Sequence, residues 1–110
     1  SFILASGGFY GGGLVAEPGQ AVEPVFNLPI AAPALQEEWS NFQMFSNEAQ
    51  PFEKIGIAVD DSLRPVNAEG KVLLDNVFIA GRNLCGYDFC FEKSGNGVAM
   101  ASGYKAAMSV

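Results

Sequence analysis

Histidine is absent from the sequence, and charged residues make up only 16% of its 110 positions. Without an imidazole, the chain cannot by itself form a serine–histidine triad, a cysteine–histidine pair or a histidine-ligated metal site. Six Lys and Arg against twelve Asp and Glu give a formal net charge of −6. The sequence offers no basic patch that neutralises phosphates, so we expect no nucleic-acid partner. The 49% apolar content is nevertheless too high for a disordered tail.

Cysteine is scarce, because Cys85 and Cys90 are the only two. No further thiol or imidazole completes a zinc site around them. A disulfide between them is sterically possible, and a redox pair is an alternative, but no neighbouring pattern of cations lowers a thiol pKa. Because no signal peptide is visible, we interpret both as reduced packing residues of a cytoplasmic protein.

Long apolar runs are missing as well, because proline, glycine or a charge interrupts each one before the ~18 residues that span a bilayer. Any membrane association is therefore expected to come through a partner. The length fits one modest domain. The chain opens inside an apolar segment, residues 1–5, that is typical of a buried strand. We therefore expect a piece of a larger protein, with an exposed sheet edge where flanking strands are missing.

The pattern of apolar residues predicts a mixed α/β fold, in which a small sheet and a hairpin are covered by a C-terminal helix. The alanine-rich segment Gly97–Met108 predicts that helix, with Ser94 or Asn96 as its N-cap. Strands are expected near residues 2–5, 55–59 and 77–80, and the hairpin around residues 64–74.

Between these elements, repeated prolines favour extended segments and turns over a long helix. An edge strand is an option at residues 25–28. The next segment predicts a short helix that ends before Pro51, because apolar residues recur there at spacings of four, three and three. These residues are Leu35, Trp39, Phe42 and Phe45, and we interpret the three aromatic ones as core or interface anchors.

The segment from Val77 to Ala107 carries the chemistry of most interest. A buried strand leads into Gly81, and a glycine-bearing loop is followed by Gly95-Asn96-Gly97 and a helix. Glycines let backbone N–H groups approach a ligand, and a helix N-terminus carries partial positive charge. Together they suit a phosphate or the pyrimidine edge of a flavin. The simpler interpretation, which spacing alone favours, is that the glycines only make tight turns.

The other polar candidates are weaker. Asp60 and Asp61 are adjacent and point apart on a turn, so a solvated turn is expected rather than a metal site or an acid–base pair. Arg64 is expected to pair with a carboxylate. Arg82, directly after Gly81, is the better candidate for a ligand contact.

Several longer motifs resemble a known family. AGRNLCGYD and SGNGVAMASGYKAA resemble the C-terminal flavin-binding signature of the succinate dehydrogenase/fumarate reductase-like flavoproteins, and ILASGGFYGGGLVAE resembles the segment where their chain leaves the flavin domain. In this order along the chain, SGGFYGGGLVAE, EPVFNLPI, QPFEKIGIAVDDSLRP and NVFIAGRNLCGYD resemble the B subunits of anaerobic glycerol-3-phosphate dehydrogenases. The resemblance covers nearly the whole chain.

The resemblance implies the C-terminal part of a two-domain flavoprotein. Residues 1–14 would be a core strand and glycine turn of the flavin domain, residues 15–54 a segment of the substrate or cap region, and residues 55–110 the C-terminal portion of the flavin domain. Carried over position by position, the resemblance places nine residues beside the flavin: Gly7, Gly8, Gly81, Gly86, Asp88, Gly95, Asn96, Gly97 and Val98. We add Arg82, because it directly follows Gly81. Two departures are Cys85, where similar sequences often have glycine, and Asn96, which interrupts a glycine run.

The implied reaction is oxidation of sn-glycerol 3-phosphate to dihydroxyacetone phosphate. The implied cofactor is FAD or FMN, which the chain alone is not expected to retain, since the G-x-G-x-x-G dinucleotide unit has no match. The implied partners are a catalytic flavin subunit and an iron–sulfur membrane-anchor subunit that passes electrons to quinone, which would place the protein in the cytoplasm, peripheral to the inner membrane. No catalytic residue or metal ligand is assigned. The alternatives are a non-catalytic interaction module of the same fold, or a related succinate dehydrogenase or fumarate reductase-like oxidoreductase.

Overall fold

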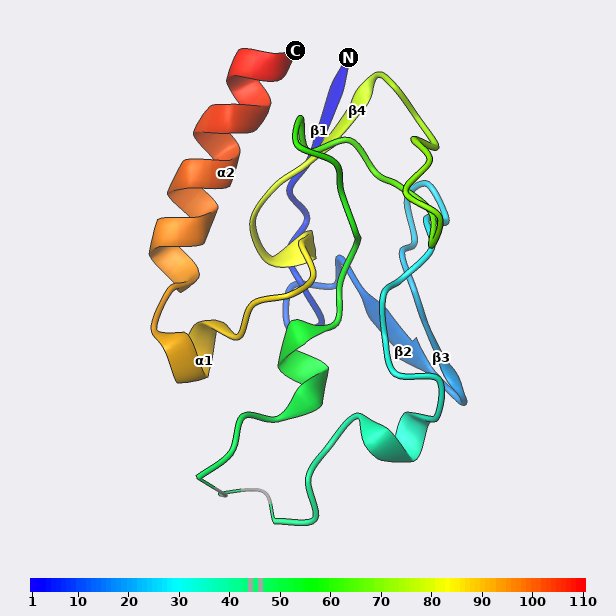
Figure 1. Ribbon diagram of the computed structural model, residues 1–110, viewed down its shortest axis with the longest axis vertical. Helices are drawn as coiled ribbons and strands as arrows, with labels where there is room; N and C mark the ends of the chain where they lie inside the picture. Colours follow the sequence, from blue (N-terminus) through cyan, green and yellow to red (C-terminus); the bar gives the residue numbers. More distant parts are fainter. Residues whose placement is uncertain (44, 46) are drawn as a thin grey trace.

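The computed structural model describes residues 1–43, 45 and 47–110, with only the backbone of Phe91. It confirms a mixed α/β fold: two small sheets, short helical turns and one long C-terminal helix (Figure 1). The elements in chain order are β1 (Phe2–Leu4), β2 (Val15–Glu17), β3 (Gln20–Val22), the 3-10 turns η1 (Gln36–Glu38) and η2 (Pro51–Lys54), β4 (Val77–Ile79), the 3-10 turn η3 (Gly81–Asn83), α1 (Phe89–Glu92) and α2 (Gly95–Ser109).

The first and fourth strands form the central sheet, although they lie far apart in the sequence. β1 and β4 pair in parallel, with Phe2 opposite Val77 and Leu4 opposite Ile79. Alternate side chains of a strand point to opposite faces, and both faces of β4 are buried. Such burial on two sides is typical of a strand in a parallel sheet. The strands expected near residues 2–5 and 77–80 are therefore confirmed.

Two apolar clusters cover the two faces of β4. On one face, Val77 and Ile79 pack with Leu4, Leu28 and Ile57. On the other face lie Phe78 and Ala80, which pack with Leu63 of a loop and Ala106 of α2. The helix expected at residues 97–108 is thus present and covers the sheet as predicted. It begins two residues earlier, with Ser94 at the N-cap position.

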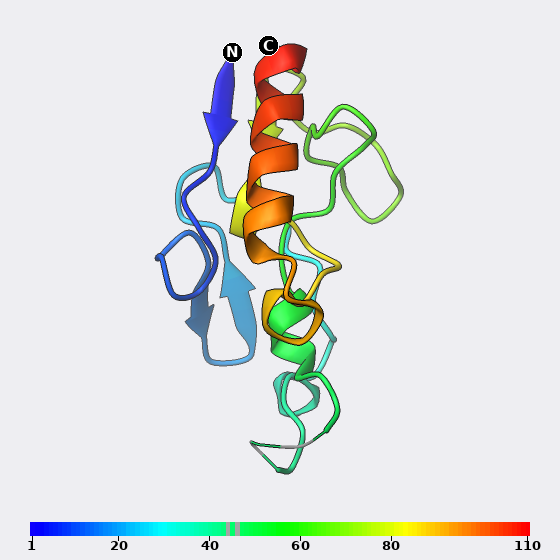
Figure 2. The same cartoon turned by 90° about the vertical axis from the view of Figure 1, so that its left-hand side faces the viewer.

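The long helix runs antiparallel to the central strands. Figures 1 and 2 both show the C-terminal end of α2 beside the N-terminal end of β1, so the first turn of α2 lies toward the carboxyl ends of β1 and β4. Among the described residues, no helix has both the length and the apolar character needed to cross a membrane.

The second sheet is the antiparallel pair β2–β3, which turns at Gly19 with a φ of 79°. The edge strand considered at residues 25–28 is wrong, because this segment folds as a turn around the carboxylate of Glu23. That carboxylate accepts hydrogen bonds from the amides of Val25 (2.6 Å), Phe26 (2.8 Å) and Leu28 (3.3 Å). The amides that would have built a strand ladder are therefore already paired.

The helix predicted from Leu35 to Phe45 is wrong for the residues that the structure describes; Met44 lies outside them. Only the single turn η1 forms, and of the three aromatic residues only Trp39 is buried, while Phe42 and Phe45 are exposed. The side chain of Gln50 crosses the loop and accepts the amide of Asn41 at 2.7 Å. Such cross-loop hydrogen bonds replace the ones that a helix would have made.

Residues 55–59 do not form the expected continuous strand but make isolated bridges to three different segments. Ile57 bridges in parallel to Leu84, and Val59 bridges to Pro65 in antiparallel fashion. The hairpin expected around residues 64–74 is present in reduced form, with one bridge between Val66 and Val72.

Asp60 organises the turn that precedes this hairpin. Its carboxylate accepts the amides of Ser62 and Arg64, both at 2.9 Å, and forms an ion pair with the Arg64 guanidinium at 2.8 Å. The pairing expected for Arg64 is confirmed, whereas Asp60 is more than a solvated turn residue. Partial burial by itself would raise the pKa of Asp60, but these hydrogen bonds outweigh it and hold that pKa below its usual value of 3.8.

Stability is therefore expected to depend on Asp60 at acid pH. The pKa of this carboxyl is lower in the folded protein than in the unfolded chain. Asp60 therefore stabilises the fold at pH values above its usual pKa, and this stabilisation is lost as the pH falls through the lower pKa of the folded state. We expect Asp60→Asn to lower the free energy of unfolding at pH 7 and to flatten its decline below about pH 4. Urea unfolding at a series of pH values measures this. Asp61→Asn, on the same turn, is the control, and an equal effect of both substitutions would contradict the prediction.

Candidate functional site

The carboxyl ends of β1 and β4 bring the N-terminal glycine turn against η3. The amide of Gly7 donates to Oδ1 of Asn83 at 3.0 Å, and Nδ2 of the same asparagine donates to Oγ of Ser6 at 3.1 Å. Gly8 lies so close that a Cβ there would be 3.3 Å from the Arg82 carbonyl oxygen. Four predicted residues, Gly7, Gly8, Gly81 and Arg82, are thus brought together at the strand ends. In open α/β sheets, ligands bind at this edge.

Arg82 lies at the centre of this region. Its guanidinium forms an ion pair with the Glu53 carboxylate at 3.0 Å, and the other oxygen of Glu53 accepts the Tyr10 hydroxyl at 3.2 Å. The guanidinium also lies 3.9 Å from the ring centroid of Phe89 and 5.7 Å from that of Tyr87. Partial burial and then Glu53 raise the pKa of Tyr10. The cation is held by a carboxylate and an aromatic face, which limits its reorientation.

The same phenylalanine connects Arg82 to the first turn of α2. A Cβ at Gly95 would lie 3.2 Å from the Cβ of Phe89, so only glycine fits without displacement. At Gly97, in contrast, a Cβ would meet nothing within 4 Å, so open space lies beside this glycine. A direct hydrogen bond also joins α2 to η3, because the amide of Gly81 donates to Oγ of Ser102 at 2.9 Å.

The amides of eight of the ten predicted residues fall into two groups. Five already donate within the protein, namely those of Gly7, Gly81, Gly86, Asp88 and Val98. Val98 makes the first helical hydrogen bond, to the Ser94 carbonyl at 2.8 Å. The amides of Gly95, Asn96 and Gly97 precede it, and helix geometry gives these three positions no acceptor inside the helix.

This arrangement fits part of a flavin site. Three amides at the positive end of a 15-residue helix, with open space at Gly97, suit an electron-rich edge such as the flavin pyrimidine carbonyls. The site thus has two halves, the strand ends with η3 and the first turn of α2. Two buried oxygens in the segment between them, Tyr87 Oη and Ser94 Oγ, make no hydrogen bond within the part of the chain that the structure describes. The cofactor roles of all ten residues stay predictions.

Gly86 and Asp88 lie on the loop between η3 and α1. Gly86 has a φ of 89°, and its amide donates to the Lys54 carbonyl at 3.0 Å, which ties the loop to η2. Asp88 is buried, and its carboxylate accepts the Cys90 amide at 3.0 Å. One ligand atom from each of Glu53, Asp88 and Cys90 lies within 4.8 Å of the others. Because Arg82 already neutralises Glu53, this cluster is explained as an ion-pair and hydrogen-bond network.

Both cysteines are free thiols. Burial raises the pKa of Cys85. Desolvation, followed by the carboxylates of Glu53 and Asp88, raises the pKa of Cys90 despite the nearby Arg82. A raised thiol pKa leaves less of the nucleophilic thiolate at neutral pH. A packing role fits Cys85, which is half-buried, but not Cys90, which is exposed.

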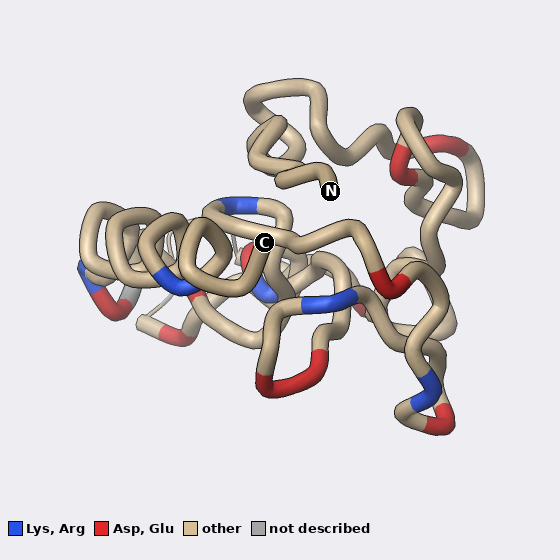
Figure 3. The backbone as a smooth tube through the Cα atoms, turned by 90° about the horizontal axis from the view of Figure 1, so that it is seen from above, with Lys and Arg blue, Asp and Glu red and all other residues tan. Residues whose placement is uncertain are grey.

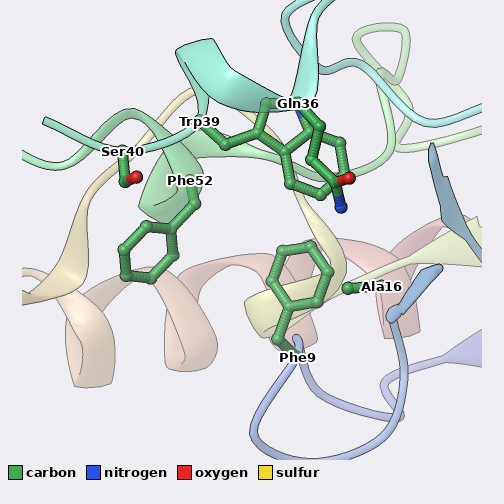
Figure 4. Close-up of a pocket in the computed structure, with 6 residues that line it drawn as sticks. All are labelled: Phe9, Ala16, Gln36, Trp39, Ser40 and Phe52. Carbon is green, nitrogen blue, oxygen red and sulfur yellow. The ribbon is translucent and has the colours of Figure 1, made fainter. Parts of the chain in front are cut away.

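Two apolar cavities lie beside the site and contain none of the ten predicted residues. The first, of about 380 Å³, lies between the β2–β3 hairpin and η1 and is lined by Phe9, Ala16, Gln36, Trp39, Ser40 and Phe52 (Figure 4). The second, of about 570 Å³, is lined by Tyr10, Ser40, Phe45, Gln50, Phe52, Glu53 and Cys90. Glu53 is common to the second cavity and to the Arg82 ion pair.

Two residues that hold this region together were not assigned from the sequence. Asn83 has no exposed surface and joins the two glycine turns, while Glu53, only 7% exposed, joins Arg82 to Tyr10. The signal available was indirect, because both residues occur in motifs, AGRN and QPFEK, that carry the family resemblance.

Comparison with known proteins agrees with the resemblance expected from the sequence. The chain is 40% identical to the B subunit of anaerobic glycerol-3-phosphate dehydrogenase from Vibrio vulnificus strain YJ016, over 100% of this chain and 27% of that protein. It is 38% identical to the B subunit from Aliivibrio fischeri strain MJ11 and 36% identical to the probable B subunit from Halobacterium salinarum, over 99% and 96% of this chain and 24% of each relative.

No protein-family model matches the chain, and no solved structure matches it. The chain spans about a quarter of the length of these curated relatives. Along its whole length, it is therefore related to a section of the B subunit of anaerobic glycerol-3-phosphate dehydrogenase.

Proposed function

We propose that the chain forms the C-terminal part of the flavin domain in a dehydrogenase that oxidises sn-glycerol 3-phosphate to dihydroxyacetone phosphate. The observation that carries this proposal is the meeting of Gly7, Gly8, Gly81 and Arg82 at the carboxyl ends of two parallel strands. Segments that lie 76 residues apart in the chain converge at the edge where α/β sheets bind ligands. The names of the relatives supply the substrate.

In this proposal the flavin, FAD or FMN, supplies the two-electron redox chemistry when bound. The first amides of α2 donate to its pyrimidine edge and stabilise negative charge there. The Gly7–Gly8 turn and η3 shape the neighbouring wall, and the Arg82–Glu53 ion pair lies beside them. The rest of the subunit provides the groups that hold the remainder of the cofactor, since the dinucleotide motif has no match in this sequence.

The proposal includes partners that complete the electron pathway. A catalytic flavin subunit and an iron–sulfur membrane-anchor subunit would receive the electrons and pass them to quinone. Membrane association would then be peripheral and would come through the anchor subunit. The relatives are named as one subunit of a dehydrogenase, which supports a multi-subunit assembly.

Two glycines of α2 provide a matched test of the cofactor site. In the full-length B subunit, we expect Gly97→Val to abolish the saturable quenching of flavin fluorescence, because the new side chain enters the open space beside the first amides of α2. Gly103→Val is the control, since a Cβ there also meets nothing within 4 Å but the position lies almost two turns further along the helix. Equal loss in both variants, or retention in both, would contradict the assignment.

The substrate is tested separately in the intact complex. We expect glycerol 3-phosphate to reduce the bound flavin, and succinate not to do so. The second candidate function is a non-catalytic interaction module, which is favoured by the large apolar side chains exposed on α2. Flavin fluorescence that never changes with added protein would support the module.

A further inference from the structure

We propose that the outward face of α2 is an internal packing surface, covered by the part of the full-length B subunit that this chain does not span. This proposal rests on the proposed function only in treating the chain as a section of that subunit. Three large side chains, Met100, Tyr104 and Met108, are 75%, 71% and 71% exposed. Their spacing of four residues places them along one face of the helix.

The opposite face of the same helix is the one that packs on the sheet. Ser102 and Ala106 are its buried residues, and at 100° per residue they lie across the helix from Tyr104. Small residues thus face β4 and η3, whereas large apolar residues face solvent. This is the reverse of a surface helix, in which charged and polar residues occupy the solvent side.

Charge is also nearly absent from α2. Lys105 is its only charged residue among 15, and Figure 3 shows the helix almost entirely without acidic or basic positions. A helix that is apolar on all sides is typical of a protein interior, where neighbours cover every face. The low charge therefore favours an apolar packing partner over an oppositely charged surface.

The central sheet is incomplete among the residues that the structure describes. β1 pairs with β4 along one edge only, and Phe2 and Ile3 are exposed. Parallel sheets in α/β proteins have further strands and helices on both faces, supplied through crossover connections of the same polypeptide. The relatives are about four times as long as this chain, so they contain the chain length that such layers need. The rest of the subunit is therefore favoured as the occupant over a second copy of this chain. A copy related by a two-fold axis would pair its own β1 antiparallel to β1, which would not extend the parallel sheet.

Cysteine labelling of the full-length B subunit tests the proposal. Tyr104→Cys is compared with Lys71→Cys, which lies at an exposed hairpin position, and modification by a maleimide is followed by peptide mass spectrometry. We expect position 104 to react roughly tenfold or more slowly than position 71 in the native subunit, and equally fast in urea. Equal native rates would overturn the proposal. Protection that requires the partner subunits, or that increases with protein concentration, would also overturn it by identifying a different occupant.

A second measurement keeps the result independent of the flavin. The same labelling is carried out on flavin-loaded and flavin-free subunit, and protection at position 104 is expected in both. If the subunit binds no flavin and position 104 is still protected, the proposed function fails while the packing surface stands. Tyr104→Glu is expected to lower the melting temperature of the subunit more than Lys105→Glu, the neighbouring control, because it places a charge in an apolar interface.

Discussion

Replacing Gly56 with alanine is expected to destabilise the protein by about 3 kcal/mol or more. A Cβ at this position would lie 2.6 Å from the Leu84 carbonyl carbon and the Cys85 amide nitrogen, and 2.7 Å from the Asn83 carbonyl oxygen. All three are backbone atoms, so no side-chain rotation relieves the overlap. The segments are also locked together by hydrogen bonds from the Ile57 amide to Asn83 (2.7 Å) and from the Cys85 amide to Ile57 (3.2 Å).

Urea unfolding measures the effect of Gly56→Ala against a glycine in open space. Gly103→Ala is the control, and it is expected to stabilise the protein by up to about 1 kcal/mol, because alanine favours a helix interior over glycine. A Gly56→Ala protein as stable as the unsubstituted one would show that the backbone segments separate easily, and this would contradict the prediction.

Asn83→Ala is expected to give the second large loss, of about 3 kcal/mol, because it leaves two groups without their partner. The half-buried Gly7 amide loses its acceptor and the hydroxyl of the exposed Ser6 loses its donor, and each lost hydrogen bond costs about 0.5–1.5 kcal/mol. The substitution also leaves a cavity, since Asn83 has no exposed surface. Hydrogen exchange at the Gly7 amide is expected to accelerate along with the decrease in unfolding free energy.

Two further variants separate the role of Asn83 from a general effect of losing an amide. Asn96→Ala removes an exposed asparagine from α2 and is expected to change stability by no more than about 0.5 kcal/mol. Asn83→Asp keeps an acceptor for Gly7 but loses the Nδ2 donor, and it is expected to fall between the other two. A loss for Asn83→Ala no larger than that for Asn96→Ala would contradict the bridging role.

The parts of the fold that could be predicted from sequence are those encoded locally. The continuous apolar run Val77–Ile79 and the alanine-rich stretch of α2 are recognisable from their local composition, so their structures follow from neighbouring residues. The pattern from Leu35 to Phe45 also suggested a helix, but Gln50 pairs with the backbone of Asn41 across the loop. The spacing of apolar residues does not reveal a hydrogen bond between residues nine apart, so this one could not be predicted from the sequence.

The same distinction applies to the candidate site. Glycines at the strand ends were found through the resemblance, because their motifs are contiguous in sequence. The pairs that join them are not contiguous: 29 residues separate Glu53 from Arg82, and 76 separate Gly7 from Asn83. A buried glutamate or asparagine looks ordinary in sequence, and its importance follows only from the partner that the fold brings to it.

One guanidinium contacts both halves of the site, the strand ends and the start of α2. Arg82 contacts Glu53 on one side and the Phe89 ring on the other, and Phe89 in turn lies against the start of α2 at Gly95. An anionic molecule that draws Arg82 away from Glu53 would therefore change the free energy of ordering the helix start. If it does so, reciprocity requires that a ligand ordering that helix start alters the affinity for the anion at the strand ends by the same factor.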